Sequence, residues 1–374
     1  MKKEFGSIKP LVQELKKKAK KPIPPDSLEK GILDDIRKHT STFNRNNLTR
    51  TKAYLDYYLR NPQIHWSFLA HMVSRNAGWS MTDLKGEWLP RILREDEAET
   101  FFHFLERGNW LIFQDAFPQL LLFEEGKKRE KNLSHLLPHI QVSRFMQVNW
   151  NYYIETQDST LLSMALIINE QNYIESRLIQ DPYYQEQVLS TLQFKLQDIL
   201  SLNQILFPFQ GQGRIPDLLG QTLHQFASLH ERIELGKRLY KILFRDEWNR
   251  KKVEEWASSH PHTGSRKDYW FHLFNDVKDS VPGMPYKIRI EKCSLKDRTL
   301  RIYSPKLPQV WPDIEHKQGD KEDWYKDWKE AGYLLGEIEL QDERIEARYC
   351  KALEKIDLAI AAQELLYPPH EGSE

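Results

Sequence analysis

The sequence predicts a mainly α-helical protein, with a multi-helical globular core, a small β-hairpin and a long C-terminal helix. Three observations favour this fold class. Apolar residues recur at helical spacing almost throughout the segment from Ser27 to about Asp276. Glycine is scarce, with 16 residues, which is typical of helices and not of a turn-rich β fold. After Val281 the pattern changes, first to short alternating runs and then to one long helical run.

Residues 1–26 are expected to form a basic, flexible arm that ends in a proline-containing linker. Within residues 1–25, eight lysines face only two glutamates. Apolar residues at i, i+3, i+4 and i+7 from Ile8 also permit a short amphipathic helix. A solvated tail is the simpler interpretation, and contact with an anionic surface is the alternative. The lysines that would make this contact are Lys16, Lys17, Lys18, Lys20 and Lys21.

Residues 27–281 are expected to form the helical core domain. The predicted helices lie near 27–38, 48–60, 63–77, 81–93, 95–107, 109–124, 142–155, 159–179, 183–205, 217–244, 246–258 and 266–277. Gly78 and Gly108 stand where helices are expected to end. Phe207–Pro216 is expected to be a loop, and its glycine spacing matches neither a P-loop nor a dinucleotide fingerprint.

Residues 282–374 are expected to pack on the core as a hairpin, a loop and a helix. Tyr286–Lys292 and Thr299–Tyr303 are rich in β-forming residues and predict the hairpin. Asp342–Leu366 has an apolar face at helical spacing and predicts the last helix. Docking of this helix on the core is the simpler interpretation, and its exchange within a dimer is the alternative.

The stretch Ile64–Leu93 holds polar residues in an apolar helical setting. His71 and Arg75 lie four residues apart, so they project from adjacent turns of one helix. A buried arginine requires a charge partner, and we therefore expect an ion pair with Asp83 or Glu87. The alternative interpretation is an anion-binding or catalytic pocket.

The loop Ser258–Asp268 is a second segment of interest. Ser265 is expected to cap a helix that begins near Arg266, and capping alone explains the loop. The free N–H groups there could also hold an anion. His260 and His262 form a lone HxH pattern, which is too weak to predict a metal site. The candidate anion- or ligand-binding residues of the two segments are His71, Arg75, Asn76, His262, Ser265 and Arg266.

The composition excludes several classes of protein. The 54 basic residues balance the 54 acidic ones, which argues against a protein that binds nucleic acid specifically. Cys293 and Cys350 are far apart and show no CxxC spacing, so we expect no disulfide framework, and sparse cysteines suit a reducing cytosol. No apolar run reaches the about 20 residues of a membrane span, and no signal peptide is evident. We expect a cytoplasmic protein without a cofactor.

Three segments resemble the YppC-like family of bacterial proteins of unknown function: LAHMVSRNAGWSMTDLKGEWLP, RIELGKRLYKILF and HPHTGSRKDYWFHLF. The resemblance extends from about Asn46 to Tyr367. It implies membership of a family without a known activity, cofactor or catalytic residue, so it does not by itself predict a function.

Motifs of catalysis are missing from the sequence. It contains no GxSxG elbow, HExxH pair, Walker motif or kinase set. The leading prediction is therefore a non-enzymatic interaction or adaptor protein with a protein partner. The alternative is a hydrolase or transferase that acts on a phosphorylated or other anionic substrate. Burial of Arg75 in a salt bridge would favour the first, and convergence of the polar residues on an open cleft would favour the second.

Overall fold

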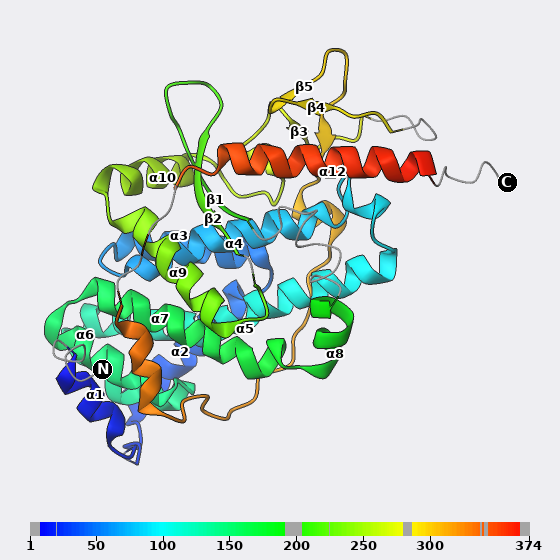
Figure 1. The fold of residues 1–374 in the computed structure, drawn as a ribbon. Coiled ribbons are helices and arrows are strands. Elements are labelled where there is room, and N and C mark those ends of the chain that lie inside the picture. The colour runs from blue at the N-terminus through cyan, green and yellow to red at the C-terminus, as the bar shows by residue number, and fades with distance from the viewer. Residues whose placement is uncertain are drawn as a thin grey trace.

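The computed structural model describes residues 8–19, 21–190, 204–223, 225–279, 286–336, 339 and 343–366. Over these residues the chain is mainly helical, and its strands form three two-stranded sheets (Figure 1). The predicted fold class is confirmed, including the small antiparallel hairpin and the long C-terminal helix. No helix in this described part of the chain is long and apolar enough to cross a membrane.

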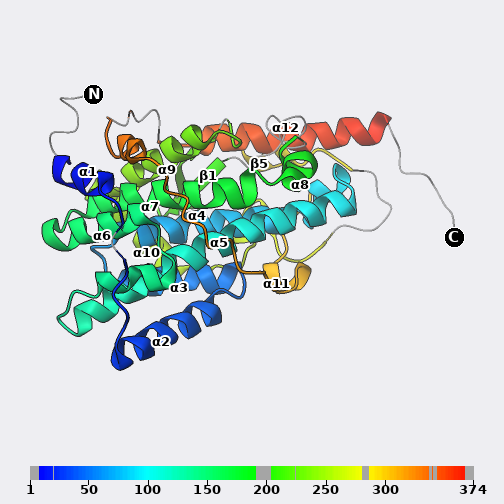
Figure 2. The same ribbon diagram turned by 90° about the horizontal axis from the view of Figure 1, so that it is seen from below.

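The elements follow one another in a helical order broken by short strands. The α-helices are α1 (Lys9–Lys16), α2 (Ser27–Phe43), α3 (Asn47–Arg60), α4 (His65–Asp83), α5 (Glu95–Lys128), α6 (Arg144–Thr156), α7 (Ser159–Ile174), α8 (Pro182–Tyr184), α9 (Leu229–Phe244), α10 (Glu247–Ser259), α11 (Leu307–Val310) and α12 (Glu346–Leu366). The strands are β1 (Gln204–Phe209), β2 (Asp217–Thr222), β3 (Phe274–Asn275), β4 (Ile290–Glu291), β5 (Ser294–Leu295) and β6 (Ile302–Tyr303). Short helical turns include η2 (Ser134–Ile140), η7 (Arg266–Asp268) and η8 (Trp328–Leu334). Figure 2 shows α2 and α12 on opposite sides of the molecule, with α4, α5 and α7 between them.

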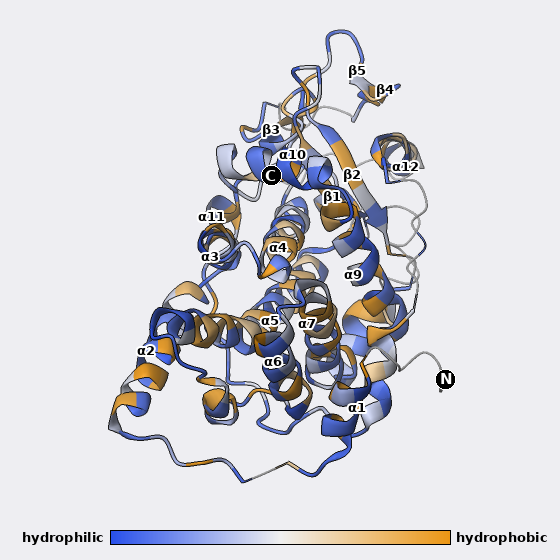
Figure 3. Cartoon of the chain, turned by 90° about the vertical axis from the view of Figure 1, so that its left-hand side faces the viewer, coloured by the Kyte–Doolittle hydropathy of each residue, from blue (hydrophilic) through white to orange (hydrophobic). Residues whose placement is uncertain are grey.

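Helix α4 forms the centre of the core. It contacts α3, α5, α7 and α9 as well as strand β1. Its apolar residues surround nearly the whole helix, and Trp66, Phe68 and Trp79 are each at most 1% exposed. Figure 3 shows hydrophobic residues gathered where α4, α5 and α7 face one another. Burial of one large apolar side chain stabilises a fold by about 1.5–3 kcal/mol, so α4 is a main source of stability.

Two glycines that were expected to end helices lie inside them. Gly78 lies within α4, where an added Cβ atom would be 2.4 Å from Asn47 Oδ1 and from His262 Nε2. Gly108 lies within α5, where a Cβ atom would be 3.1 Å from Leu178 Cδ2. The predicted helix ends are therefore wrong, because these glycines permit close packing against neighbouring segments and do not stop the helix.

Replacement of Gly78 by alanine is expected to destabilise the protein by about 1–3 kcal/mol, because the methyl group overpacks a filled site. Replacement of Gly31 in α2 provides the matched control, because nothing lies within 4 Å of its added Cβ atom. That change is expected to stabilise the protein by up to about 1 kcal/mol, as is usual inside a helix. Urea unfolding measures the change in the free energy of unfolding for each variant. If Gly78→Ala also stabilises the protein, Gly78 is an ordinary helical glycine.

The segment around β1 and β2 differs from the prediction. The two strands pair in antiparallel register and form a β-hairpin. Of the loop expected over Phe207–Pro216, the first three residues belong to β1 and the others form the turn that leads to β2. The helix predicted over 217–244 is replaced at its start by β2 and continues as α9. Of the helix predicted over 183–205, residues 191–203 lie outside the described residues, and its last residues belong to β1.

The predicted C-terminal hairpin is present in shorter form. Strands β4 and β5 pair in antiparallel register, which confirms a hairpin beside the predicted arm Tyr286–Lys292. The other predicted arm, Thr299–Tyr303, contains β6, which pairs in parallel with β3 instead. The helix expected over 266–277 is wrong, because the chain makes only the short turn η7 before it enters β3. The predicted last helix is confirmed as α12.

A disulfide joins the β4–β5 turn to α12. Cys293 and Cys350 are bonded, and their Cα atoms are 5.3 Å apart. The expectation that these cysteines form no disulfide is wrong, because tertiary packing brings together residues that are 57 positions apart in sequence.

The carboxylate of Asp357 on α12 supports the same region of the chain. It is fully buried and accepts hydrogen bonds from the backbone N–H groups of Arg289 and Ile290, each at 2.7 Å. It also accepts a hydrogen bond from the Tyr286 hydroxyl. Helix α12 therefore supplies the hydrogen-bond acceptor for backbone groups that would otherwise be buried without one.

Helix α1 is docked on the core, in contrast to the expected flexible arm. Its apolar face is buried, with Leu11 1% exposed, and the helix packs against α6 and η8. The Tyr325 hydroxyl donates to the Leu15 carbonyl at 2.9 Å, and the Lys16 ammonium lies 4.0 Å from the centre of the Trp328 ring. The lysines expected to contact an anionic surface include Lys20, which lies outside the described residues, whereas Lys17, Lys18 and Lys21 are exposed. The domain boundaries at residues 26 and 281 remain a prediction.

Candidate functional site

Arg75 lies at the interface of α4 with the C-terminal end of α10. Its Nε donates to His71 Nε2 at 3.1 Å, and its Nη2 donates to the carbonyls of Ala257, at 3.0 Å, and His260. The guanidinium lies 4.8 Å from the centre of the Trp256 ring. Burial lowers the pKa of Arg75 to about 10. The carbonyls at a helix C-terminus attract a cation, and they take the place of a carboxylate here.

The ion pair predicted between Arg75 and Asp83 or Glu87 is therefore wrong. Among the described residues, no carboxylate lies within ion-pair distance of Arg75. Asp83 pairs with Arg266, with Nη2 at 2.6 Å from Oδ2, and Glu87 pairs with Arg289 at 3.0 Å. Sequence proximity did not identify these partners, which come from segments far along the chain.

His71 is held as a neutral imidazole. Its Nδ1 is 2.8 Å from the Thr51 carbonyl oxygen, so Nδ1 carries the proton and Nε2 accepts from Arg75. Burial, assisted by the charge of Arg75, lowers the pKa of His71 well below its ordinary value. Both ring nitrogens are thus engaged within the protein, which leaves neither free to act as a general base.

His262 joins the same buried network from the other side. Its Nε2 is 2.9 Å from Asn47 Oδ1, and its Nδ1 is 3.5 Å from Asp268 Oδ2. Asp268 accepts from the Thr263 backbone N–H at 2.8 Å and from its hydroxyl at 2.6 Å. Burial lowers the pKa of His262, although Asp268 opposes this effect.

Ser265 and Arg266 bind other parts of the same chain. The Ser265 hydroxyl donates to the Ser304 carbonyl at 2.5 Å and accepts from the Lys267 backbone N–H at 3.2 Å, so the predicted cap is present on the short turn η7. Arg266 donates to both carboxylate oxygens of Asp83 and to two tyrosine hydroxyls. The Arg266 guanidinium is thus paired with a carboxylate of the protein itself.

Asn76 binds α4 to strand β1. Its side chain accepts from the Leu206 backbone N–H at 2.8 Å and donates to the Leu206 carbonyl at 2.9 Å. The six predicted residues therefore lie on α4 and the loop Ser258–Asp268, where Arg75 faces α10 and Asn76 faces β1, and each contacts its own chain. These contacts favour a structural role, and the binding of an external anion there stays a prediction.

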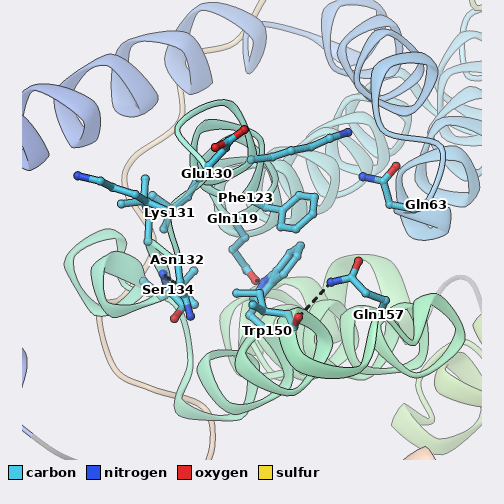
Figure 4. A pocket seen from close by; sticks show the side chains of 15 residues that line it. Gln63, Gln119, Phe123, Glu130, Lys131, Asn132, Ser134, Trp150 and Gln157 are labelled. Carbon is cyan, nitrogen blue, oxygen red and sulfur yellow. Dashed lines mark hydrogen bonds between the residues drawn. The ribbon is translucent and has the colours of Figure 1, made fainter.

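An open pocket that the sequence did not indicate lies between α5, η2 and α6. It has a volume of about 520 Å³, and Figure 4 shows Gln119, Phe123 and Trp150 close together in its middle, with the other labelled side chains around them. Phe123 and Trp150 form its aromatic floor, with stacked rings whose centres are 5.4 Å apart. The polar side chains at its edge are Gln63, Lys127, Glu130, Lys131, Asn132, Ser134 and Gln157. We call this hollow the α5–α6 pocket.

Buried hydrogen bonds fix the floor of the α5–α6 pocket. The Trp150 indole N–H donates to Gln119 Oε1 at 2.9 Å, and Gln119 Nε2 donates to Asp115 Oδ2 at 3.0 Å. Asn169 also donates to Asp115, at 2.5 Å. Burial raises the pKa of Asp115 to about 7. The orientation of the Trp150 ring is therefore set by side chains beneath it, which pre-organises the pocket.

The chemistry of the α5–α6 pocket suits binding. Its edge carries both signs of charge and several amides, but no histidine or cysteine. No group of three or more metal-ligating side chains occurs anywhere in the described part of the chain. Gly126 permits the chain to turn sharply after α5, because an added Cβ atom there would lie 2.7 Å from the Lys131 carbonyl oxygen.

The fold and these two sites define a helical protein with a buried polar network and an open aromatic pocket. The chain belongs to the family described as Protein of unknown function (DUF2515), whose model matches residues 42–344. It is 39% identical over 295 residues to Uncharacterized protein YppC of Bacillus subtilis (strain 168), and the alignment covers 79% of this chain and 83% of that protein. The resemblance predicted from three segments is thereby confirmed. No solved structure matches the chain.

Proposed function

We propose that the protein is a non-enzymatic interaction protein of the cytoplasm, and that its α5–α6 pocket receives an apolar side chain of a partner protein. The observation that carries this proposal is the composition of the pocket. A fixed aromatic floor is surrounded by charged and amide side chains. Interfaces between proteins commonly have such an apolar centre and polar rim, and large aromatic residues dominate their binding energy.

The charged residues at the edge of the pocket are suited to orient a partner. Glu130 and Lys131 are exposed, and neither makes an ion pair among the described residues. A partner that places complementary charges beside its apolar side chain would therefore gain contacts without breaking existing ones. Exposed charges of this kind mainly accelerate association and select the partner.

The alternative function, a hydrolase or transferase, is supported by one observation. His262 and Asp268 lie side by side, as a general base and its orienting carboxylate would. However, both side chains are at most 6% exposed, and the adjoining Thr263 hydroxyl donates to Asp268. This arrangement lacks access for a substrate, so the interaction protein is the better supported proposal.

The cytoplasmic location that we propose bears on the disulfide between Cys293 and Cys350. Disulfides are rare in the cytosol of mesophiles, where thiols are kept reduced. We expect Cys293 and Cys350 to stay close together in the reduced protein, because the hydrogen bonds of Asp357 join the same two elements.

Site-specific photo-crosslinking in the native host tests the proposed function. A benzophenone amino acid at Lys131, on the edge of the pocket, is expected to form an adduct with one partner protein. The same probe at Trp248, which is 52% exposed on α10, provides the control position. Phe123→Ala should abolish the Lys131 adduct, whereas Phe271→Ala, at a 45% exposed site elsewhere, should preserve it. An adduct that persists in folded Phe123→Ala protein would contradict the pocket as the binding site.

A further inference from the structure

The β4–β5 hairpin and α12 together form a basic surface at one end of the molecule. The disulfide and the hydrogen bonds of Asp357 hold the two elements side by side, at the end opposite α1 and α2 (Figure 1). Over residues 286–301 and 350–358, the exposed side chains include two acidic residues, Glu291 and Asp297, and six basic ones. The basic residues are Lys287, Lys292, Arg298, Arg301, Lys351 and Lys355. We call this surface the hairpin–helix face.

The six cations of the hairpin–helix face form no ion pairs with any residue that the structure describes. By contrast, Arg289 of the same hairpin is buried and pairs with Glu87 at 3.0 Å. Fully exposed cations elsewhere do pair, as Arg94 does with Asp96 at 3.0 Å. An external anionic group can therefore bind to the hairpin–helix face without displacing an existing partner of these cations.

Two of the cations lie at turns whose backbone disfavours their side chains. The hairpin turn is the two-residue loop Lys292–Cys293, in which both residues have a positive φ, of 51° and 61°. Arg298 has a φ of 59° in the next turn. Glycine or asparagine ordinarily occupies such positions. The disulfide accounts for Cys293, whereas the turn geometry does not require a lysine or an arginine. Strained residues of this kind are frequent at functional sites.

Two exposed leucines lie among the cations. Leu300 is 46% exposed and lies next to Arg301 in sequence, and Leu358 is 58% exposed on α12. Helical spacing places Leu358 on the same face of α12 as Lys351 and Lys355. Aliphatic side chains beside lysine or arginine suit the boundary of a lipid bilayer, where phosphate groups bind the cations and the acyl region receives the apolar groups.

We propose that the hairpin–helix face docks on an anionic lipid membrane, with Leu300 and Leu358 entering the headgroup region. A nucleic acid or an acidic protein would also attract the cations. The exposed leucines favour the bilayer, because they lie on elements at the edge of the molecule (Figure 3), where a broad surface can reach both. Cytoplasmic leaflets carry anionic lipids, so such docking agrees with the proposed location. The hairpin–helix face shares no residue with the α5–α6 pocket, and this inference does not depend on the partner of that pocket.

Flotation of the full-length protein with vesicles of phosphatidylglycerol and phosphatidylcholine tests the proposal. We expect binding at low salt that weakens as salt rises, and no binding to vesicles of phosphatidylcholine alone. Lys292→Asn/Arg298→Asn removes two charges and places asparagine where the backbone favours it, so the variant should be at least as stable as wild type. Its binding should weaken about ten- to thirtyfold, because each cation near an anionic membrane contributes about fivefold.

Lys30→Gln/Lys38→Gln on α2 is the matched control, because it removes the same charge from exposed positions on the opposite side of the molecule (Figure 2). It should change vesicle binding by less than about twofold, since these lysines lie far from the membrane. Leu300→Ser/Leu358→Ser should weaken binding several-fold at unchanged net charge, because the apolar contacts are lost.

Three outcomes would count against membrane docking. Failure of the folded wild-type protein to bind anionic vesicles at low salt would overturn the proposal. Equal effects of the hairpin variant and the α2 variant would overturn the hairpin–helix face as the docking surface. Unchanged binding of the leucine variant would overturn the entry of the leucines into the bilayer. Each of these results leaves the crosslinking test of the α5–α6 pocket unaffected.

Discussion

Arg266→Met is expected to lower the free energy of unfolding by up to about 3–5 kcal/mol, the cost of breaking a fully buried pair, because it leaves the 20% exposed carboxylate of Asp83 without its cation. The variant also removes the donor to the hydroxyls of Tyr269 and Tyr349. Asp83→Asn in the same chain should recover part of the loss, because it removes the unpaired charge. A double-mutant cycle by urea unfolding measures the coupling of the pair.

The stability of the Arg266→Met variant is expected to depend on pH, and the pKa of Asp83 gives the direction. Burial raises the pKa of Asp83, and Arg266 opposes this rise. Without Arg266 the folded-state pKa lies further above the unfolded value of 3.8. The folded variant then holds the Asp83 proton more tightly than the unfolded chain, so its stability falls as pH rises between these two values. The free energy of unfolding of the variant should therefore lie closer to that of wild type in acid than at neutral pH. Arg94→Met, which breaks an exposed pair, should show almost no deficit at any pH.

Leu11→Ala is expected to destabilise the protein by about 2–5 kcal/mol, although the residue belongs to a segment whose composition suggests a dispensable tail. The side chain is 1% exposed, and its truncation leaves a cavity between α1 and α6. Lys17→Ala on the exposed face, where Lys17 pairs with Glu14, should change stability by less than about 1 kcal/mol. Urea unfolding distinguishes the two changes. A neutral Leu11→Ala variant would show that α1 does not contribute to the stable core.

The elements that could be predicted from the sequence are those whose pattern is local. Helices α10 and α12 follow from the spacing of their apolar residues along the chain. The hairpin of β1 and β2 was missed because Pro208 lies within β1, and proline ordinarily argues against a strand. Gly78 was taken as a helix end because its true neighbours, Asn47 and His262, are distant in sequence.

The candidate site shows the same division between local and distant information. The pairing of His71 with Arg75 was predictable, because helical spacing places them together. Their remaining partners were not, because the Ala257 carbonyl is 182 residues away from Arg75. The α5–α6 pocket was missed for another reason. Phe123 and Trp150 look like ordinary core residues, and only the arrangement of three elements shows that their rings line a hollow.

The hydrogen bonds of Asp357 have a consequence for the order in which the protein assembles during synthesis. The ribosome produces Arg289 long before Asp357, because 68 residues separate them. Until α12 has emerged, the backbone N–H groups of Arg289 and Ile290 lack this acceptor and cannot be buried without cost. The β4–β5 region is therefore expected to close over the core only after α12 has emerged. A nascent chain that stalls before α12 keeps this edge open to chaperones and proteases.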